Sequence, residues 1–534
     1  MAAEGRARLT PTLEAPGTAD AGGPTARGRM RDWINREYLR LTLALLVTPV
    51  TLGLAWLVVR HEALPFDNVR SAALTTVIFC LLTIGLVLYV HRLPLLSFPS
   101  LFLAVTFLFT CSPLILFLME GSDAFRSWEI VDTEGILKGM PVVTLAFSSF
   151  LLGALLLPTQ ILALARGTAA STAGGAADIT PRLRALRRVG FAMYAVSALL
   201  IAASSLAGGT LSFAVEGGYT AYHEAKRSGA IPQVVGVFVA HLLPWSLLIL
   251  TATSRDRRSR RQVVLLAVPF ILVMLGVGDR GGPVATMGVV ASGLYLVGAR
   301  IGLWRSLALV ALIAFLIPTI LNLRQVPISE VSVSTVANAA TNQVQAANTF
   351  GDDPVSGFLS SMSSPYQTLM KTVVAVPYIE GYHLGGDYLA SLIVAVPFRS
   401  IIFPFIGAEI DRLPPSQWIL PLLHPGKNAG LGYLQMAEAY LQFGAIGVVG
   451  LYLIFGWGLT RLWRSMTSKA PDPRALAFAL IVVMETLLWV RNSSSFGVRA
   501  VAWGWIIVYV IPALLTRKRS AAPPRGEMVA VAHR

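Results

Sequence analysis

Long apolar runs constrain this chain more than any other feature of its sequence. Each has roughly the 17–25 mostly apolar residues that a helix needs to cross the hydrocarbon core of a bilayer. Backbone polar groups find no water in that core, so only helices or closed barrels can cross it. With 55% hydrophobic and 13% charged residues and a mean hydropathy of +0.65, the chain is predicted to be an all-α, polytopic membrane protein.

About twelve membrane-spanning helices are predicted from these runs. They are expected at about 41–59, 71–90, 98–119, 139–165, 190–208, 234–253, 262–278, 284–299, 304–323, 431–460, 474–490 and 500–516. The chain is thereby divided into an N-terminal tail (1–38), spans one to nine (39–323), a long loop (324–430), spans ten to twelve (431–516) and a C-terminal tail (517–534). The first tail is rich in Ala, Gly, Pro and Thr without periodicity, and it is predicted to be disordered.

Positive residues set the predicted orientation. The net charge of +15 lies in short clusters between apolar runs, such as RDRRSRR at 255–261. This pattern is typical of the cytoplasmic ends of membrane helices, and no nucleic-acid partner is expected. With the N-terminus inside, every alternate loop is basic, so both termini are predicted to be cytoplasmic.

The long segment 324–430 then falls on the outer side of the membrane. A segment of this length between two spans is too long for a simple connector and is expected to be functional. Within it, 388–406 is apolar but interrupted by Pro397, Arg399 and Pro404. It is therefore predicted to form a pair of short interfacial or re-entrant helices.

Four arginines are predicted on this outer side, at the ends of different helices. They are Arg280, Arg324, Arg491 and Arg499. Guanidinium groups gathered at a membrane surface can bind a phosphate or pyrophosphate bidentately. The alternative is that each arginine only anchors its helix to lipid phosphates.

Arg280 lies in the short turn VGDRGGPVA between two predicted spans. Gly281 and Gly282 allow close approach of a ligand to the backbone. Such a turn is expected to lie below the water surface, where a charge needs a partner or a ligand. Asp279 could supply a local partner, so both interpretations stay open.

Glu438 interrupts the apolar helix that follows the long loop. At helical spacing, Gln435, Glu438 and Gln442 share one face, which must meet protein or a wet cavity rather than lipid. The carboxylate could be a general base or a structural partner of an outer-side arginine. Glu485, deeper in a later span, is interpreted as structural or helix-pairing.

His424 and Asn428 lie in the loop just before that helix. His424 could reach the cavity as a base or hydrogen-bond donor, or it could simply be exposed. The chain has no P-loop, no HExxH motif and no GxGxxG between a strand and a helix, and its acidic pair Asp352-Asp353 is weak as a metal motif. No metal and no cofactor are therefore predicted.

Two segments resemble O-antigen polymerases, which are also called oligosaccharide repeat-unit polymerases. They are the GDRGG turn and the helix AEAYLQFGAIGVVGLYL, which is followed by a basic inner loop. The similarity in pattern covers roughly residues 190–516. It implies a multi-span, metal-independent, inverting glycosyltransferase on the outer face of the bacterial inner membrane.

The resemblance also implies the substrates and the role of the arginines. The donor would be a glycan on undecaprenyl pyrophosphate, and the acceptor a hydroxyl of another lipid-linked repeat unit. Arg280, and with it Arg324, Arg491 and Arg499, would bind the pyrophosphate leaving group. In related ligases a loop histidine beside an asparagine is important, whereas here PGK separates His424 from Asn428. Membrane lipid, a chain-length regulator and a flippase would be partners.

Two other functions stay open from the sequence. A ligase would transfer the finished glycan to a different acceptor, and its chemistry would be nearly the same. A flippase or transporter of lipid-linked sugars would need charged residues along both halves of its path, whereas the candidates here gather on the outer side.

Overall fold

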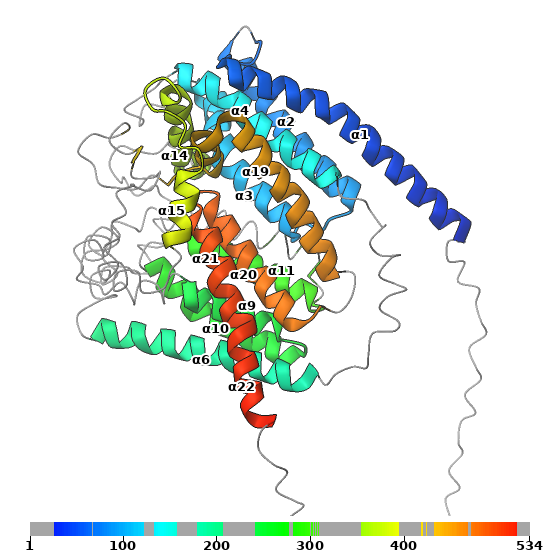
Figure 1. Cartoon of the computed structure of the whole chain (residues 1–534), viewed down its shortest axis with the longest axis vertical. Coiled ribbons are helices and arrows are strands. Elements are labelled where there is room, and N and C mark those ends of the chain that lie inside the picture. The colour runs from blue at the N-terminus through cyan, green and yellow to red at the C-terminus, as the bar shows by residue number, and fades with distance from the viewer. Residues whose placement is uncertain are drawn as a thin grey trace, which may run out of the picture.

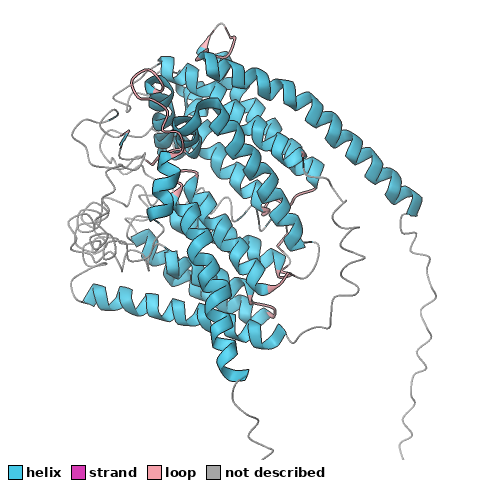
Figure 2. Ribbon diagram, in the orientation of Figure 1, coloured by secondary structure: helices cyan, strands magenta, loops and turns pink. Residues whose placement is uncertain are grey.

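Most of the helices expected from the apolar runs are present in the computed structural model of the chain. The structure describes residues 26–66, 68–121, 133–156, 179–206, 241–276, 281–299, 354–394, 432–467 and 471–520, with single positions between 301 and 308 and between 418 and 423. These residues form helices and connecting turns and contain no strand, which confirms the all-α prediction for this part of the chain (Figure 2).

The helices have the following bounds: α1 Ala26–Arg60, α2 Val69–His91, α3 Phe98–Glu120, α4 Thr133–Leu155, α6 Ile179–Leu206, α9 Leu243–Ala252, α10 Arg257–Gly276, α11 Gly281–Leu296, α14 Pro354–Ala375, α15 Gly386–Val394, α19 Gln435–Thr467, α20 Pro473–Trp489, α21 Ser495–Trp505, the π-helical turn η4 Ile506–Val510, and α22 Ile511–Ser520. Seven segments in the described part are long and apolar enough to cross a membrane. The total of twelve spans stays a prediction.

Two groups of helices pack side by side (Figure 1). The first group consists of α1, α2, α3, α4, α14 and α19, and the second of α6, α9, α10, α11, α20, α21 and α22. Helix α20 contacts α3 and α19, and α11 contacts α3, which joins the groups. The turn between α20 and α21 therefore lies where residues of both groups can meet.

Glycines let α4 and α19 cross closely inside the first group. A Cβ atom on Gly153 would lie 2.1 Å from the carbonyl oxygen of Leu453, and one on Gly456 would lie 2.0 Å from that of Phe150. Small residues at crossings are typical of membrane helices, where packing rather than water release drives association. This crossing fixes the position of α19 in the bundle.

Helix α19 is broken near its start. Gly444 has φ 61° and ψ −144°, a conformation that strongly favours glycine. A Cβ atom on Gly447 would lie 2.1 Å from the carbonyl oxygen of Ala439. The break leaves carbonyls of the first segment free of their helical partners, so another part of the chain can use them.

The long segment 324–430 contains a helix that the sequence did not predict. Helix α14 packs against α3, α4 and α19, with Tyr366 fully buried among them. Its small and polar side chains, among them Ser363 and Thr368, are buried as well. This composition hides the helix from a search for apolar runs. Of the predicted interfacial helices at 388–406, the described part includes only the residues in α15.

The N-terminal helix is longer than its apolar run. Helix α1 begins at Ala26, inside the tail 1–38 that was predicted to be disordered. No proline follows Pro24 in the tail, and residues 26–38 include four Arg and one Met, which favour helix. The span therefore has a polar helical extension at its N-terminal end.

Candidate active site

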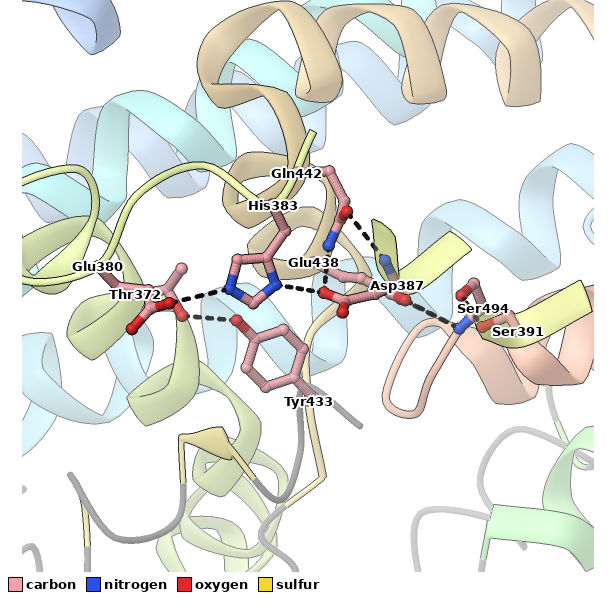
Figure 3. Close-up of polar contacts among 9 residues, drawn as sticks. All are labelled: Thr372, Glu380, His383, Asp387, Ser391, Tyr433, Glu438, Gln442 and Ser494. Carbon is pink, nitrogen blue, oxygen red and sulfur yellow. Dashed lines mark hydrogen bonds and ion pairs between the residues drawn. The ribbon is translucent and has the colours of Figure 1, made fainter. Parts of the chain in front are cut away.

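A histidine and an aspartate pair beside the break in α19 (Figure 3). His383 precedes α15, and its Nδ1 atom lies 2.7 Å from Oδ2 of Asp387, the second residue of that helix. The side chain of His383 is 15% exposed and that of Asp387 is 5% exposed. When the carboxylate accepts the Nδ1 proton, the lone pair of a neutral imidazole lies on Nε2.

Helix α19 holds this pair in place. Gln442 donates from Nε2 to Oδ2 of Asp387, and its Oε1 accepts from the backbone N–H of Asp387 at 3.4 Å. The backbone N–H of His383 donates to the carbonyl of Leu441 at 3.0 Å. That carbonyl lies just before the break at Phe443 and Gly444. The break in α19 thus provides the acceptor that fixes the His383 loop.

The surroundings of His383 make it a stronger base. The hydrogen bond to Asp387 raises the pKa of His383 above its ordinary value, and the negative charges of Asp387 and Glu380 add to the effect, while partial burial opposes it. Glu380 lies 3.5 Å from Nε2. The ring of Trp418 stands edge-on to the imidazole, with ring centroids 5.9 Å apart. An oriented imidazole beside an aromatic ring suits proton transfer from a sugar hydroxyl.

Glu438 is fully buried on the same face of α19 as Gln442. Its Oε2 atom accepts from the indole Nε1 of Trp489 at 2.7 Å and from the backbone N–H of Ser494 at 3.1 Å. Ser494 is the N-cap residue of α21, so the carboxylate lies at the positive end of that helix dipole. These contacts tie α19 to the turn between α20 and α21.

Two of the predicted arginines belong to this turn and the helix after it. The backbone carbonyl of Arg491 accepts from the N–H of Tyr433 at 2.8 Å, and its guanidinium lies 5.6 Å from the ring centroid of Phe109. Arg499 lies in the first turns of α21, 3.3 Å from a ring nitrogen of His241. The hydroxyls of Ser391 and Ser494, 2.7 Å apart, connect α15 to the same turn. The histidine pair, Glu438 and the arginine-bearing turn therefore form one connected region.

The other predicted site residues divide into two sets. Gln435 is fully buried, and its side-chain amide bonds to none of the described residues. Gly281 and Gly282 begin α11. The remaining candidates lie outside the described residues, and they are Asp279, Arg280, Arg324, His424 and Asn428. Their predicted roles stay predictions.

The sequence predicted no role for His383 or Asp387. The signal was the segment GYHLGGD, in which a leucine and two glycines separate a histidine from an aspartate. Leu384 and Gly385 adopt positive φ values of 47° and 85°, and the resulting tight turn allows the side chains to meet. A turn of this kind cannot be read from helical periodicity.

The described residues offer no group of three or more His, Cys, Asp and Glu side chains that could hold a metal ion. The chemistry that the described geometry supports is proton transfer at His383, in a region connected to the turn of Arg491 and to α21, which carries Arg499.

Comparison with known proteins agrees with the resemblance found in the sequence. The family model of the O-antigen polysaccharide polymerase Wzy matches residues 41–519, nearly the whole chain. Neither the curated proteins nor the solved structures gave a match. The chain therefore belongs to the O-antigen polysaccharide polymerase Wzy family.

Proposed function

We propose that this protein joins oligosaccharide repeat units carried on undecaprenyl pyrophosphate into a surface polysaccharide, such as an O-antigen, capsule or exopolysaccharide. The transfer is metal-independent, inverts the anomeric configuration and takes place on the outer face of the bacterial inner membrane. The observation that carries this proposal beyond the family match is the connection of the His383–Asp387 pair to the turn that carries Arg491, which leads into α21 with Arg499.

The proposal assigns the proton transfer to His383. The acceptor hydroxyl attacks the anomeric carbon of the donor, the new C–O bond forms, and the bond from that carbon to the pyrophosphate oxygen breaks. The exposed Glu380 side chain turns away from Nε2 of His383, the hydroxyl proton moves to that nitrogen, and the pyrophosphate leaves with the bonding electrons. Asp387 stabilises the imidazolium that results.

Glu438 is the competing base. Both of its oxygens face the backbone N–H of Ser494, and the indole of Trp489 also donates to one of them. A carboxylate with these contacts and no exposure is poorly placed to meet a hydroxyl, whereas the His383 side chain is partly exposed. We therefore assign Glu438 the task of holding the α20–α21 turn.

The arginines supply the electrostatic part of the reaction. A leaving pyrophosphate develops negative charge in the transition state, and preorganised cations stabilise that charge. Arg491 and Arg499 are proposed for this role, together with Arg280 and Arg324. Asp279, Gly281, Gly282, Asn428 and Gln435 would support the site, and His424 is retained as a second candidate base.

The proposed arrangement in the membrane follows from the sequence. It has about twelve spans, both termini in the cytoplasm, and the segment 324–430 on the outer side. The seven long apolar segments of the described part support a multi-pass protein. A flippase and a chain-length regulator would work in the same pathway.

A deletion strain tests the proposed function. Loss of a polymerase leaves single repeat units on the lipid carrier, whereas loss of a ligase leaves long lipid-linked chains. A purified protein that moves lipid-linked sugar between leaflets without lengthening it would instead be a flippase.

A further inference from the structure

A second chain of buried polar contacts joins α9, α20 and α21 and includes Arg499. Nδ1 of His241, just before α9, lies 3.0 Å from Oε1 of Glu485 on α20. The indole Nε1 of Trp245 donates to the same oxygen at 2.7 Å. The other ring nitrogen of His241, Nε2, lies 3.3 Å from Nη1 of Arg499. Glu485 is fully buried and His241 is 5% exposed.

The partners determine the protonation of this chain. Arg499 can only donate, so Nε2 of His241 must carry a lone pair. Nδ1 then carries the ring proton, and Glu485 must be an ionised acceptor. A protonated Glu485 that donated to Nδ1 would leave a proton on Nε2 facing the guanidinium. The one arrangement that satisfies both contacts is therefore carboxylate, neutral imidazole and guanidinium in sequence.

The imidazole orients the guanidinium without an ion pair between Arg499 and Glu485. A direct ion pair would use the guanidinium N–H groups and offset much of its charge. In the relay, Nη1 of Arg499 meets Nε2 of His241, and the carboxylate of Glu485 lies on the far side of the imidazole ring. Histidine ligands of metals are oriented by carboxylates in a comparable way.

We propose that His241 and Glu485 are positioning residues that aim Arg499 at the pyrophosphate group of the lipid-linked donor. The inference rests on the proposed function for the identity of the ligand, a prenyl pyrophosphate. It assigns roles to two residues that helix packing alone would leave as a structural pair. It also gives the two buried carboxylates matched tasks: Glu438 holds the start of α21 and Glu485 orients Arg499.

Two substitutions of His241 separate positioning from packing. In His241→Gln the amide oxygen takes the place of Nε2, so the acceptor for Arg499 is kept. In His241→Asn the amide nitrogen takes the place of Nδ1, so the donor to Glu485 is kept and the acceptor for Arg499 is lost. Both variants remove the ring, and each keeps one of the two contacts.

The assay is binding of geranylgeranyl pyrophosphate to the full-length protein in lipid nanodiscs, with geranylgeranyl monophosphate as the comparison ligand. We expect His241→Asn to weaken pyrophosphate binding about tenfold, as expected for loss of a hydrogen bond to a charged group. His241→Gln should weaken it no more than about threefold. In an Arg499→Gln background, His241→Asn should have no further effect.

Equal affinities of the two His241 variants would overturn the inference, as would His241→Asn with wild-type affinity. If His241→Asn does not fold, Glu485→Asp carries the test, because it withdraws the carboxylate from the imidazole. Wild-type affinity of Glu485→Asp would then overturn the inference. The proposed function is tested separately, by polymerisation of lipid-linked glycans. If the His241 variants bind the prenyl pyrophosphate as expected but the wild-type protein never lengthens a lipid-linked glycan, the polymerase function is contradicted and the positioning role is kept.

Discussion

The contacts of Glu438 predict a variant that loses stability more than activity. The carboxylate accepts from the Trp489 indole and the Ser494 backbone, and it is fully buried. A hydrogen bond to a charged group contributes about 1.5–3 kcal/mol, and a neutral one about 0.5–1.5 kcal/mol. Glu438→Gln can keep both contacts through its carbonyl oxygen, because both donors reach the same carboxylate oxygen. Its loss should therefore be about 2 kcal/mol.

Glu438→Leu should cost more. It removes the acceptor and leaves two donors in the bundle without one, at about 1–3 kcal/mol each, so about 3–5 kcal/mol is expected. Glu134→Gln is the matched control, because the Glu134 side chain is 61% exposed and pairs with Lys138 on the surface of α4. Exposed pairs of this kind contribute at most about 1 kcal/mol.

Unfolding of the purified protein in detergent, followed by tryptophan fluorescence, measures these stabilities, and polymer formation per folded protein measures activity. Removal of a general base costs about 10²–10⁴-fold in rate. Folded Glu438→Gln should instead keep its rate within about tenfold of wild type. A Glu438→Gln protein of full stability that has lost polymerisation would refute the structural role and restore Glu438 as the base.

Five further variants, in three sets, test other parts of the site and the bundle. His383→Gln should lower the polymerisation rate about 10²–10⁴-fold at unchanged stability. Because the neutral imidazole is the active form, the wild-type rate should fall as the pH drops through the pKa of His383, which lies above about 6.5. Asp387→Asn should move that fall in rate to lower pH. Gly456→Ala should destabilise the α4–α19 crossing by about 1–3 kcal/mol. Gly458→Ala is the control, because its added Cβ would meet nothing within 4 Å. This control should leave the unfolding midpoint unchanged or raise it. Arg491→Gln should cost about 3–4 kcal/mol of transition-state stabilisation, measured as kcat/KM for the lipid-linked donor.

Apolar runs predicted the helices that are apolar along their whole length, as a membrane span must be. The first three predicted spans match α1, α2 and α3 closely, apart from the polar start of α1. Helix α14 was not predicted because buried serines and threonines interrupt its apolar residues. Helices α4 and α9 are also buried but are apolar along their length, and both were predicted, so apolar composition rather than exposure decided which helices were found.

Of the candidate site, the sequence predicted only the contacts that depend on helical spacing within α19. Glu438 and Gln442 share a face of α19 as their spacing indicated, and Glu438 lies next to the arginine-bearing turn. The pairing of His383 with Asp387 depends on a tight turn at Leu384 and Gly385, and its support comes from the break in α19. Helical periodicity does not predict contacts between segments that are distant in the sequence.

Reaction of the purified protein with its substrate tests the central claim most directly. The full-length protein in liposomes would be given a single repeat unit on undecaprenyl pyrophosphate, in the presence of a chelator. A ladder of longer lipid-linked glycans, with release of undecaprenyl pyrophosphate and inversion at the new linkage, is the predicted result. Repeat units that stay single, or that only cross the bilayer, would contradict the account.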